Sequence, residues 1–170
     1  MSAKILVGYA TRSGSTPEVA EEIAKNLRTQ GFEVDVQAVR DVRSLEGYQA
    51  AILGAPLYIM RWHRDMRSFL SRQRKALAAL PVAIFALGPW HNKEEELKSA
   101  REQLDKELAK YSWLQPVTKE TFVGKFDPAK LGFPFSLIGP LKNMPASDER
   151  DWDVIRSWAS DVAETLQTRL

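Results

Sequence analysis

Short apolar runs alternate with helical apolar stripes along the chain. Almost continuously apolar runs, typical of strands buried on both faces of a sheet, occur at 5–9, 50–53 and 82–87. The segments 32–36 and 117–123 mix polar with apolar positions and predict more peripheral strands. Helical stripes are formed by Val19, Ala20, Ile23, Ala24 and Leu27; by Met66, Phe69, Leu70, Gln73 and Leu77; by Leu97, Ala100, Leu104, Leu108 and Tyr111; and by Ile155, Trp158, Ala159, Val162 and Leu166.

Helix caps and strand breakers predict where these elements begin and end. Thr16 is placed to cap the first helix, Pro17 suits its first turn, and Gly31 closes it. We expect the third strand to end at Gly54-Ala55-Pro56 and the fourth to stop at Gly88-Pro89.

The alternation of strands and helices predicts an α/β fold. Repeated βαβ units give a parallel sheet with helices on both faces, which is a three-layer sandwich. Five strands in 170 residues suit a doubly wound parallel sheet of order 2-1-3-4-5, in one domain over residues 1–170. In that order a crevice opens at the carboxyl ends of the strands. We expect a ligand there, between the loops 11–16, 56–63 and 88–92.

Composition narrows the chemistry and the location. The sequence has no cysteine, which excludes disulfides, thiolate metal sites and cysteine nucleophiles. The presence of only two histidines argues against a histidine-built metal site, and a net charge of +2 does not demand nucleic acid as a partner. The apolar run at 5–10 is too short for a secretion signal, and the uncharged stretch 76–92 is too short for a membrane helix. We therefore expect a soluble cytoplasmic protein.

The loop after the first strand reads Thr11-Arg12-Ser13-Gly14-Ser15-Thr16. Its hydroxyls, a glycine that lets the backbone approach a ligand, and the following helix N-terminus predict a phosphate site. An ordinary N-cap turn is the alternative, because serine and threonine are common before helices. The sequence has no Gly-x-x-x-x-Gly-Lys-Ser/Thr string and no Gly-x-Gly-x-x-Gly after the first strand. This argues against a nucleoside triphosphate site and against a dinucleotide site.

The loops after the third and fourth strands carry aromatic side chains. Tyr58 and Trp62 follow the third strand, and Trp90 follows the fourth. A flat conjugated ring would be sandwiched well by Tyr58 and Trp90, or by Trp62, although the same side chains would also pack the open end of a sheet. His63 and His91 lie on these loops, where a histidine serves either as a proton donor or as a hydrogen-bonder of its own loop.

The motif Thr-x-Ser-Gly-x-Thr directly after the first strand resembles the FMN phosphate motif of flavodoxins. The segments 53–58, 62–63, 69–70, 123–126 and 151–152, taken in order, are similar to the flavodoxin-domain branch that includes the menaquinone-dependent protoporphyrinogen IX dehydrogenases. The resemblance implies a flavodoxin-like fold and an FMN cofactor that performs the redox chemistry. It implies that the phosphate is held by Thr11, Arg12, Ser13, Gly14, Ser15 and Thr16, and that the isoalloxazine is flanked by Ala55, Pro56, Leu57, Tyr58, Leu87, Gly88, Pro89, Trp90 and His91.

Departures from that branch leave the activity open. The segment 127–143 is shorter than the basic and aromatic insertion of the bacterial dehydrogenase. Three functions follow: an oxidoreductase passing electrons to a quinone, a one-electron carrier serving a partner protein, and a flavin-binding module without turnover. Six basic residues between 61 and 75 form either a solvated helix face or a docking surface for an acidic protein, an anionic substrate or lipid head groups.

The segment 131–141 has no charged residue and carries Phe133 and Phe135. Its Pro134, Gly139 and Pro140 fit neither a long helix nor a regular strand. The segment either covers the core or, if exposed, forms a peripheral contact with the inner face of the membrane or a homodimer contact.

Overall fold

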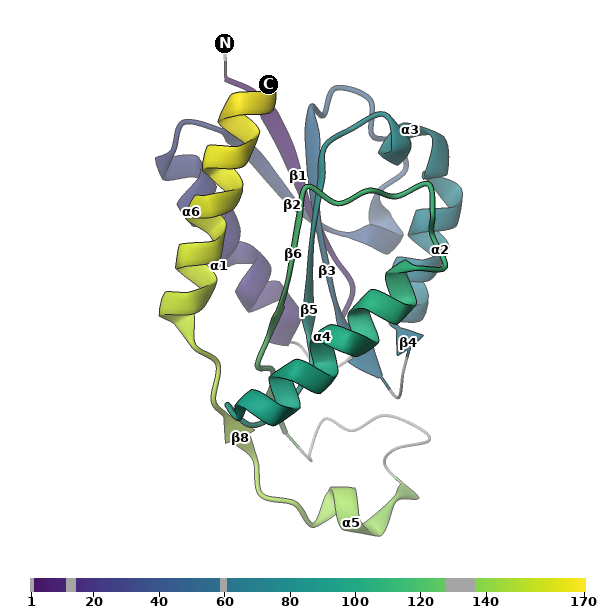
Figure 1. Ribbon diagram of the computed structural model, residues 1–170, viewed down its shortest axis with the longest axis vertical. Helices are drawn as coiled ribbons and strands as arrows, with labels where there is room; N and C mark the ends of the chain where they lie inside the picture. Colours follow the sequence, from purple (N-terminus) through teal and green to yellow (C-terminus); the bar gives the residue numbers. More distant parts are fainter. Residues whose placement is uncertain (1, 12–14, 59–60, 128–136) are drawn as a thin grey trace.

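A parallel sheet lies between two layers of helices in the computed structural model (Figure 1). The structure describes residues 2–11, 15–58, 61–127 and 137–170, with the backbone alone for Tyr58 and Leu141. The predicted five-stranded sheet and its order are confirmed, since five parallel strands follow the order β2-β1-β3-β5-β6. The two-residue strand β4 (Arg61–Trp62) is an addition that pairs antiparallel with the end of β3. The parallel strands are β1 (Lys4–Tyr9), β2 (Glu33–Ala38), β3 (Ala50–Tyr58), β5 (Val82–Leu87) and β6 (Thr118–Phe122).

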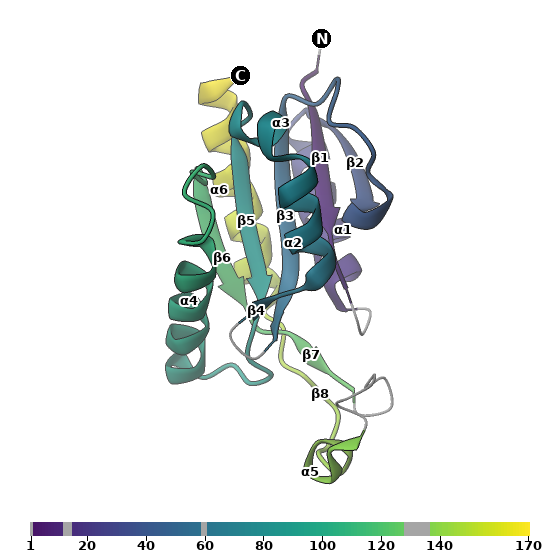
Figure 2. The same cartoon turned by 90° about the vertical axis from the view of Figure 1, so that its right-hand side faces the viewer.

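Two apolar cores lie on the two faces of this sheet. One forms under α1 (Ser15–Thr29) and α6 (Trp152–Arg169). The other forms under η1 (Val39–Asp41), α2 (Arg64–Arg72), α3 (Arg74–Ala78) and α4 (Glu94–Leu108), as Figures 1 and 2 show. All six residues of β5 are buried, as expected for a strand in the middle of a covered parallel sheet. The predicted helical stripes are thus the faces on which the helices pack.

The third strand is longer than predicted. β3 continues to Tyr58, so the prediction that Gly54-Ala55-Pro56 ends the strand is wrong. Gly54 lies in register with Phe85, and a Cβ on Gly54 would fall within the fully buried Phe85 ring. Glycine serves close packing here and not a turn. The predicted loop 56–63 is consequently the end of β3 followed by β4, with 59–60 outside the described residues.

The helix signals hold in part. Gly31 has a φ of 94° just after α1, as the predicted closure requires. α1 begins at Ser15, however, so Thr16 lies in the first turn and is not the cap. The stripe from Met66 to Leu77 is divided at Gln73, whose side chain donates to a backbone carbonyl of the η1–β3 connection at 3.1 Å. No helix in the described ranges is long and apolar enough to cross a lipid bilayer.

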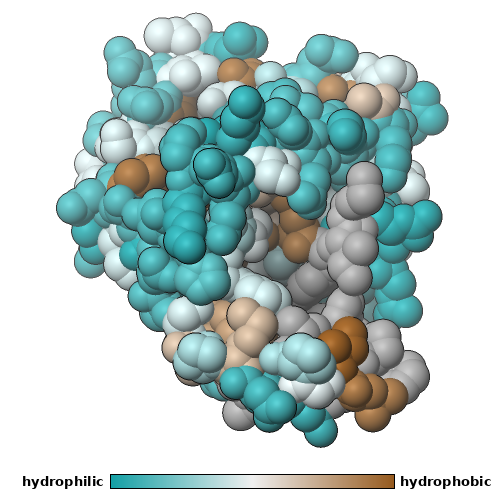
Figure 3. All heavy atoms as spheres, turned by 60° about the horizontal axis from the view of Figure 1, so that its bottom comes forward, coloured by the Kyte–Doolittle hydropathy of each residue, from teal (hydrophilic) through white to brown (hydrophobic). Residues whose placement is uncertain are grey.

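A small ribbon extends beyond the carboxyl end of the sheet (Figure 2). We call it the arm; its described parts are β7 (Lys125–Phe126), α5 (Gly139–Lys142) and β8 (Ser147–Asp148), with β7 and β8 paired antiparallel. Leu137 and Ile138, just before α5, are 72% and 43% exposed. Figure 3 views the molecule from this end and shows apolar side chains at its edge. Leu137 and Ile138 therefore do not cover the core, while residues 131–136 lie outside the described residues.

Candidate functional site

The loops after β1, β3 and β5 come together where the winding of the sheet reverses. β1 lies between β2 and β3, so the chain turns to opposite sides after β1 and after β2. The backbone N–H of Ala10 donates to the carbonyl of Gly54 at 3.0 Å, which holds the start of the first loop against the middle of the sheet. Ligands of open α/β sheets bind at such a reversal, outside the carboxyl ends of the strands.

The first turn of α1 offers groups that fit a phosphate. Its free backbone N–H groups and the positive end of the helix dipole favour an anion. Ser15 and Thr16 are 7% and 0% exposed, and Thr16 Oγ1 has no hydrogen-bond partner among the described residues. Burying an unpaired hydroxyl costs stability, and a phosphate oxygen is the kind of acceptor that would remove this cost. Thr11 is half-buried, and Arg12, Ser13 and Gly14 lie outside the described residues, so the roles of these four residues stay predictions.

A buried arginine from the other end of the chain lies against this turn. The Arg150 side chain is 3% exposed, and its Nε and Nη2 donate to the two oxygens of Asp148, each at 2.8 Å. Nη2 also donates to Glu18 Oε2 at 3.2 Å, and Nη1 donates to the Ser15 carbonyl at 3.5 Å. The hydrogen bonds between them raise the pKa of Arg150 and lower the pKa of Asp148, so both groups are charged near neutral pH.

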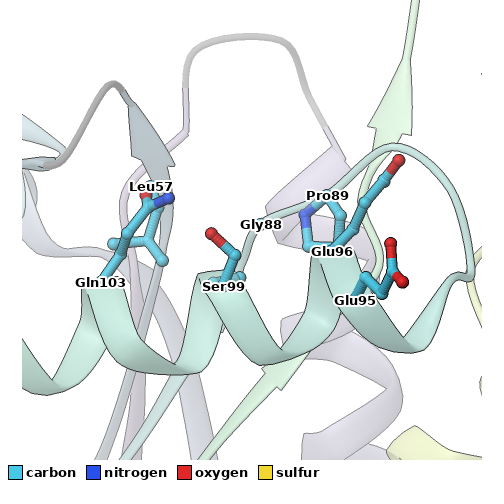
Figure 4. A pocket seen from close by; sticks show the side chains of 8 residues that line it. Leu57, Gly88, Pro89, Glu95, Glu96, Ser99 and Gln103 are labelled. Atoms are coloured by element: carbon cyan, nitrogen blue, oxygen red, sulfur yellow. The ribbon is translucent and has the colours of Figure 1, made fainter.

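The other two predicted loops meet at one pocket (Figure 4). Its volume is about 390 Å³. A Cβ on Gly88 would lie 2.8 Å from the Cβ of Ala100, so glycine allows this loop to approach α4 closely. The pocket therefore brings predicted ring residues of both loops to one place and gives it a carboxylate-rich rim. Its lining residues are Leu57, Gly88 and Pro89 from the predicted loops and Glu95, Glu96, Ser99, Ala100 and Gln103 from α4.

The aromatic side chains of these loops have different surroundings. Trp90 is half-buried and lies against Phe126 of the arm, with ring centroids 4.3 Å apart, and the Ser147 hydroxyl donates to its carbonyl at 3.5 Å. Trp62 is 1% exposed and donates its Nε1–H to the Ala55 carbonyl at 2.9 Å. Trp62 thus packs the core and braces β3, whereas Trp90, in the loop after β5, packs against the arm.

Several other residues predicted to flank the flavin ring are buried or half-buried. The side chains of Ala55 and Leu87 are buried in the core, and Pro56 is half-buried. The side chain of Tyr58 lies outside the described residues. The predicted contacts of these residues with a flavin ring stay predictions.

The two histidines make local contacts. His63 precedes α2, and its Nδ1 accepts a hydrogen bond from the Asp65 backbone N–H at 3.0 Å. His91 Nδ1 lies 3.5 Å from Glu96 Oε1. Both contacts suit the interpretation of these histidines as groups that order their own loops.

The basic residues between 61 and 75 divide into two groups. Three guanidinium groups make local contacts: Arg67 and Arg72 donate to backbone carbonyls at 3.2–3.3 Å, and Arg74 lies 5.7 Å from the ring centroid of Trp113. Arg61, Arg64 and Lys75 are exposed and form no salt bridge with the carboxylates of the described residues. Of the six basic residues in the predicted docking surface, three therefore have contacts within the protein and three are left for a partner.

Sequence reasoning missed two residues at this site. Arg150 sits in a run of acidic residues, 148–153, where a surface ion pair is the ordinary expectation. Its contact with α1 spans more than 130 residues of sequence, which no local pattern reveals. Phe126 is separated from its partner Trp90 by the whole of α4 and β6, and the two-residue strand that carries it has no periodicity to read.

Comparison with known proteins agrees with this geometry. The model of the flavodoxin domain family matches residues 6–136. Protoporphyrinogen IX dehydrogenase [quinone] of Escherichia coli K12 is 26% identical over 95 residues, which are 55% of this chain and 52% of that protein. The chain thus matches about half the length of this curated relative.

Solved structures share the fold at low sequence identity. Oxidised flavodoxin 2 from Bacillus cereus is 20% identical, with a TM-score of 0.59 over 99% of this chain and 100% of that one. Rubredoxin oxygen:oxidoreductase from Desulfovibrio gigas is 18% identical, with a TM-score of 0.61 over 97% of this chain and 36% of that one. With the family match, the sheet order and the phosphate-fitting turn in agreement, the chain belongs to the flavodoxin domain family.

Proposed function

We propose that this protein binds FMN and transfers electrons from a reduced substrate to a quinone. The observation that carries the cofactor is the buried Thr16 hydroxyl, which lies in the first turn of α1 and lacks a partner among the described residues. A phosphate at this turn would accept hydrogen bonds from Thr16 Oγ1 and from the α1 backbone N–H groups. FMN supplies the redox chemistry when bound, and the chain binds and orients it.

Trp90 and Tyr58 are proposed to orient the ring at the pocket shared by β3, β5 and α4. The arm base steadies the Trp90 loop through Phe126 and through the hydrogen bond from the Gly124 N–H to the Pro89 carbonyl, 2.8 Å long. A quinone acceptor is supported by the name of the curated relative, protoporphyrinogen IX dehydrogenase [quinone]. The same name, that of a dehydrogenase, supports an oxidisable organic compound as the electron donor.

A second candidate is a one-electron carrier that serves an acidic partner protein. The exposed cations Arg61 and Arg64, at and just after β4, favour it, because positive charge at the carboxyl end of the sheet would steer such a partner.

One experiment on the purified protein tests both parts. Its absorption spectrum and the flavin released on heating should identify FMN at one per chain. The protein is then reduced anaerobically and mixed with a soluble menaquinone analogue or with an iron-haem protein that accepts single electrons. Faster reoxidation by the quinone analogue supports the oxidoreductase, and faster reoxidation by the haem protein supports the carrier. Purified protein without flavin that binds none on addition would contradict the proposal.

We also propose a location at the inner face of the cytoplasmic membrane. Leu137 and Ile138 are exposed on the arm, with the exposed cation Lys142 next to them and Arg61 at the same end of the sheet. Exposed apolar side chains with a cation next to them suit an anionic lipid surface, which also holds quinones.

Flotation with anionic vesicles at low and high salt tests this location. A Leu137→Ser/Ile138→Ser variant should lose salt-sensitive binding. Leu170→Ser, which removes an exposed apolar side chain at the opposite end of the molecule, should retain it. If the parent does not bind vesicles but forms a dimer that the double variant has lost, then Leu137 and Ile138 form a homodimer contact and not a membrane contact.

A further inference from the structure

Arg150 joins three parts of the molecule that are distant in sequence. Arg150 lies between β8 and α6. Its guanidinium donates two 2.8 Å hydrogen bonds to Asp148 of β8 and lies 4.8 Å from the ring centroid of Trp152 in α6. From there it reaches the first turn of α1, where it contacts the Ser15 carbonyl and the Glu18 carboxylate. A guanidinium held on so many sides is rigid, so its charge has a fixed position.

The charges around it pose a problem for an anionic ligand. Glu18 lies in the first turn of α1. Asp148 is close to it, because Arg150 Nη2 donates a hydrogen bond to each of the two carboxylates. Two carboxylates near the place of a phosphate dianion would repel it. With Arg150 this cluster has one negative charge, and without Arg150 it has two. Three of the five buried polar or charged residues in the described part of the chain, Ser15, Thr16 and Arg150, gather at this corner.

We propose that Arg150 is a positioning residue for the cofactor phosphate, which it serves by neutralising Glu18 and by fixing the Ser15 backbone in the first turn of α1. The inference rests on the proposed function, because it assumes that the phosphate binds at this turn. Arg150 also ties the base of the arm to the turn through Asp148, and the arm holds Trp90 through Phe126. The phosphate end and the ring end of the site are therefore braced by the same ribbon.

The test compares the affinities of the apoprotein for FMN and for riboflavin, which differ in the phosphate alone. Arg150→Met keeps the length of the side chain and leaves Asp148 and Glu18, which are 42% and 52% exposed, in contact with water. We expect Arg150→Met to weaken FMN binding about tenfold and riboflavin binding less than about twofold, because it removes a charge that acts on the phosphate. Glu18→Gln should act in the opposite direction and strengthen FMN binding. Inorganic phosphate should compete with FMN less well in Arg150→Met than in the parent.

Arg156→Met is the matched control. Arg156 also links α6 to α1, through a 2.7 Å ion pair with Glu22, but one turn further from the helix N-terminus and exposed to solvent. It should leave the ratio of FMN to riboflavin affinity unchanged. Thermal unfolding of each apoprotein checks that the variants fold.

Each outcome separates this inference from the proposed function. Equal losses of FMN and riboflavin affinity in Arg150→Met would show that Arg150 supports only the general fold, and would overturn the inference. Unchanged FMN affinity in Arg150→Met would overturn it as well, while a parent that binds FMN tightly still upholds the proposed function. A parent that binds neither flavin would overturn both.

Discussion

The middle of the sheet and its carboxyl end obey different packing rules. In the middle, every residue of β5 is buried and apolar, and the absence of a side chain at Gly54 leaves space for the Phe85 ring. At the carboxyl end, a hydroxyl and a guanidinium are buried at Thr16 and Arg150, while apolar side chains of the arm are exposed. A buried polar group costs stability unless it has a hydrogen-bond partner, and exposed apolar groups that gather in a patch mark interaction sites. The contrast is the reason why we propose that groups at the carboxyl end serve a ligand or a partner and not the fold.

The largest effect is expected in the middle of the sheet. Gly54→Ala should lower the free energy of unfolding by about 3 kcal/mol or more, because the added Cβ meets the buried Phe85 ring and the packed core cannot yield. Phe85→Leu in the same chain should recover part of the loss. Gly139→Ala, where no atom of the described residues lies within 4 Å of the added Cβ, is the control. Urea unfolding measures all four proteins, and a Gly54→Ala variant as stable as the parent would show that β3 and β5 do not pack as described.

Two buried threonines, one in the proposed phosphate site and one outside it, allow a direct test. Thr16 in α1 and Thr121 in β6 both have a buried hydroxyl without a partner among the described residues. Thr16→Val and Thr121→Val should each leave the apoprotein as stable as the parent or raise its stability by about 1 kcal/mol. Only Thr16→Val should weaken FMN binding, by about tenfold, because only the Thr16 hydroxyl is proposed to contact the phosphate. Flavin titrations with parallel urea unfolding check this, and equal FMN affinities in the two variants would remove Thr16 from the site.

A smaller effect is expected at the ring end. Trp90→Ala should reduce the quenching of bound flavin fluorescence and lower stability by about 1 kcal/mol, since it also loses its contact with Phe126. Trp113→Ala is the matched control, because Trp113 packs near Tyr111 in the connection before β6, at the other end of the sheet. Tyr58→Ala tests the second proposed ring contact. If Trp90→Ala and Tyr58→Ala keep the parent spectrum and flavin affinity, the ring lies elsewhere.

The smallest effect concerns a polar pair far from the site. The Tyr48 hydroxyl donates to Asp35 at 2.6 Å, which lowers the pKa of Asp35, while burial together with Asp35 raises the pKa of Tyr48 to about 12. Asp35 therefore contributes stability above its unfolded pKa of 3.8 that is lost as the pH falls through the lower folded pKa. Tyr48 contributes stability below pH 10 that is lost as the pH rises towards 12.

The variant Asp35→Asn tests this pair. Its stability should change less than the parent's between pH 5 and the acid transition, by under about 1 kcal/mol because the pair is partly solvated. FMN affinity at neutral pH should not change. Urea unfolding across the pH range gives the result, and a variant with the parent's acid dependence would assign that dependence to other carboxylates.

The sequence predicts the fold well because the middle strands have a simple signal. Residues 82–87 are apolar throughout, and the structure forms β5 over the same residues. Gly54 misled the prediction because a glycine that accommodates a neighbouring ring looks like a glycine that makes a turn. Only the structure, which places Phe85 opposite it, separates the two.

The candidate site could be predicted only as far as its groups lie together in the sequence. The hydroxyl residues at the start of α1 and the aromatic residues at the end of β3 and after β5 follow from the positions of the strands. Arg150 and Phe126 belong to the site through contacts across the fold, and neither lies in a regular pattern. Charge and burial around such residues depend on packing, which composition and periodicity do not encode.

We propose above all that the first turn of α1 binds a phosphate carried by a flavin. The most direct measurement is a titration of the apoprotein with FMN and with riboflavin, followed by the quenching of flavin fluorescence. We predict that FMN binds at least about tenfold more tightly than riboflavin, because charge-assisted hydrogen bonds to the phosphate are available only to FMN. Equal affinities for the two flavins would contradict the claim.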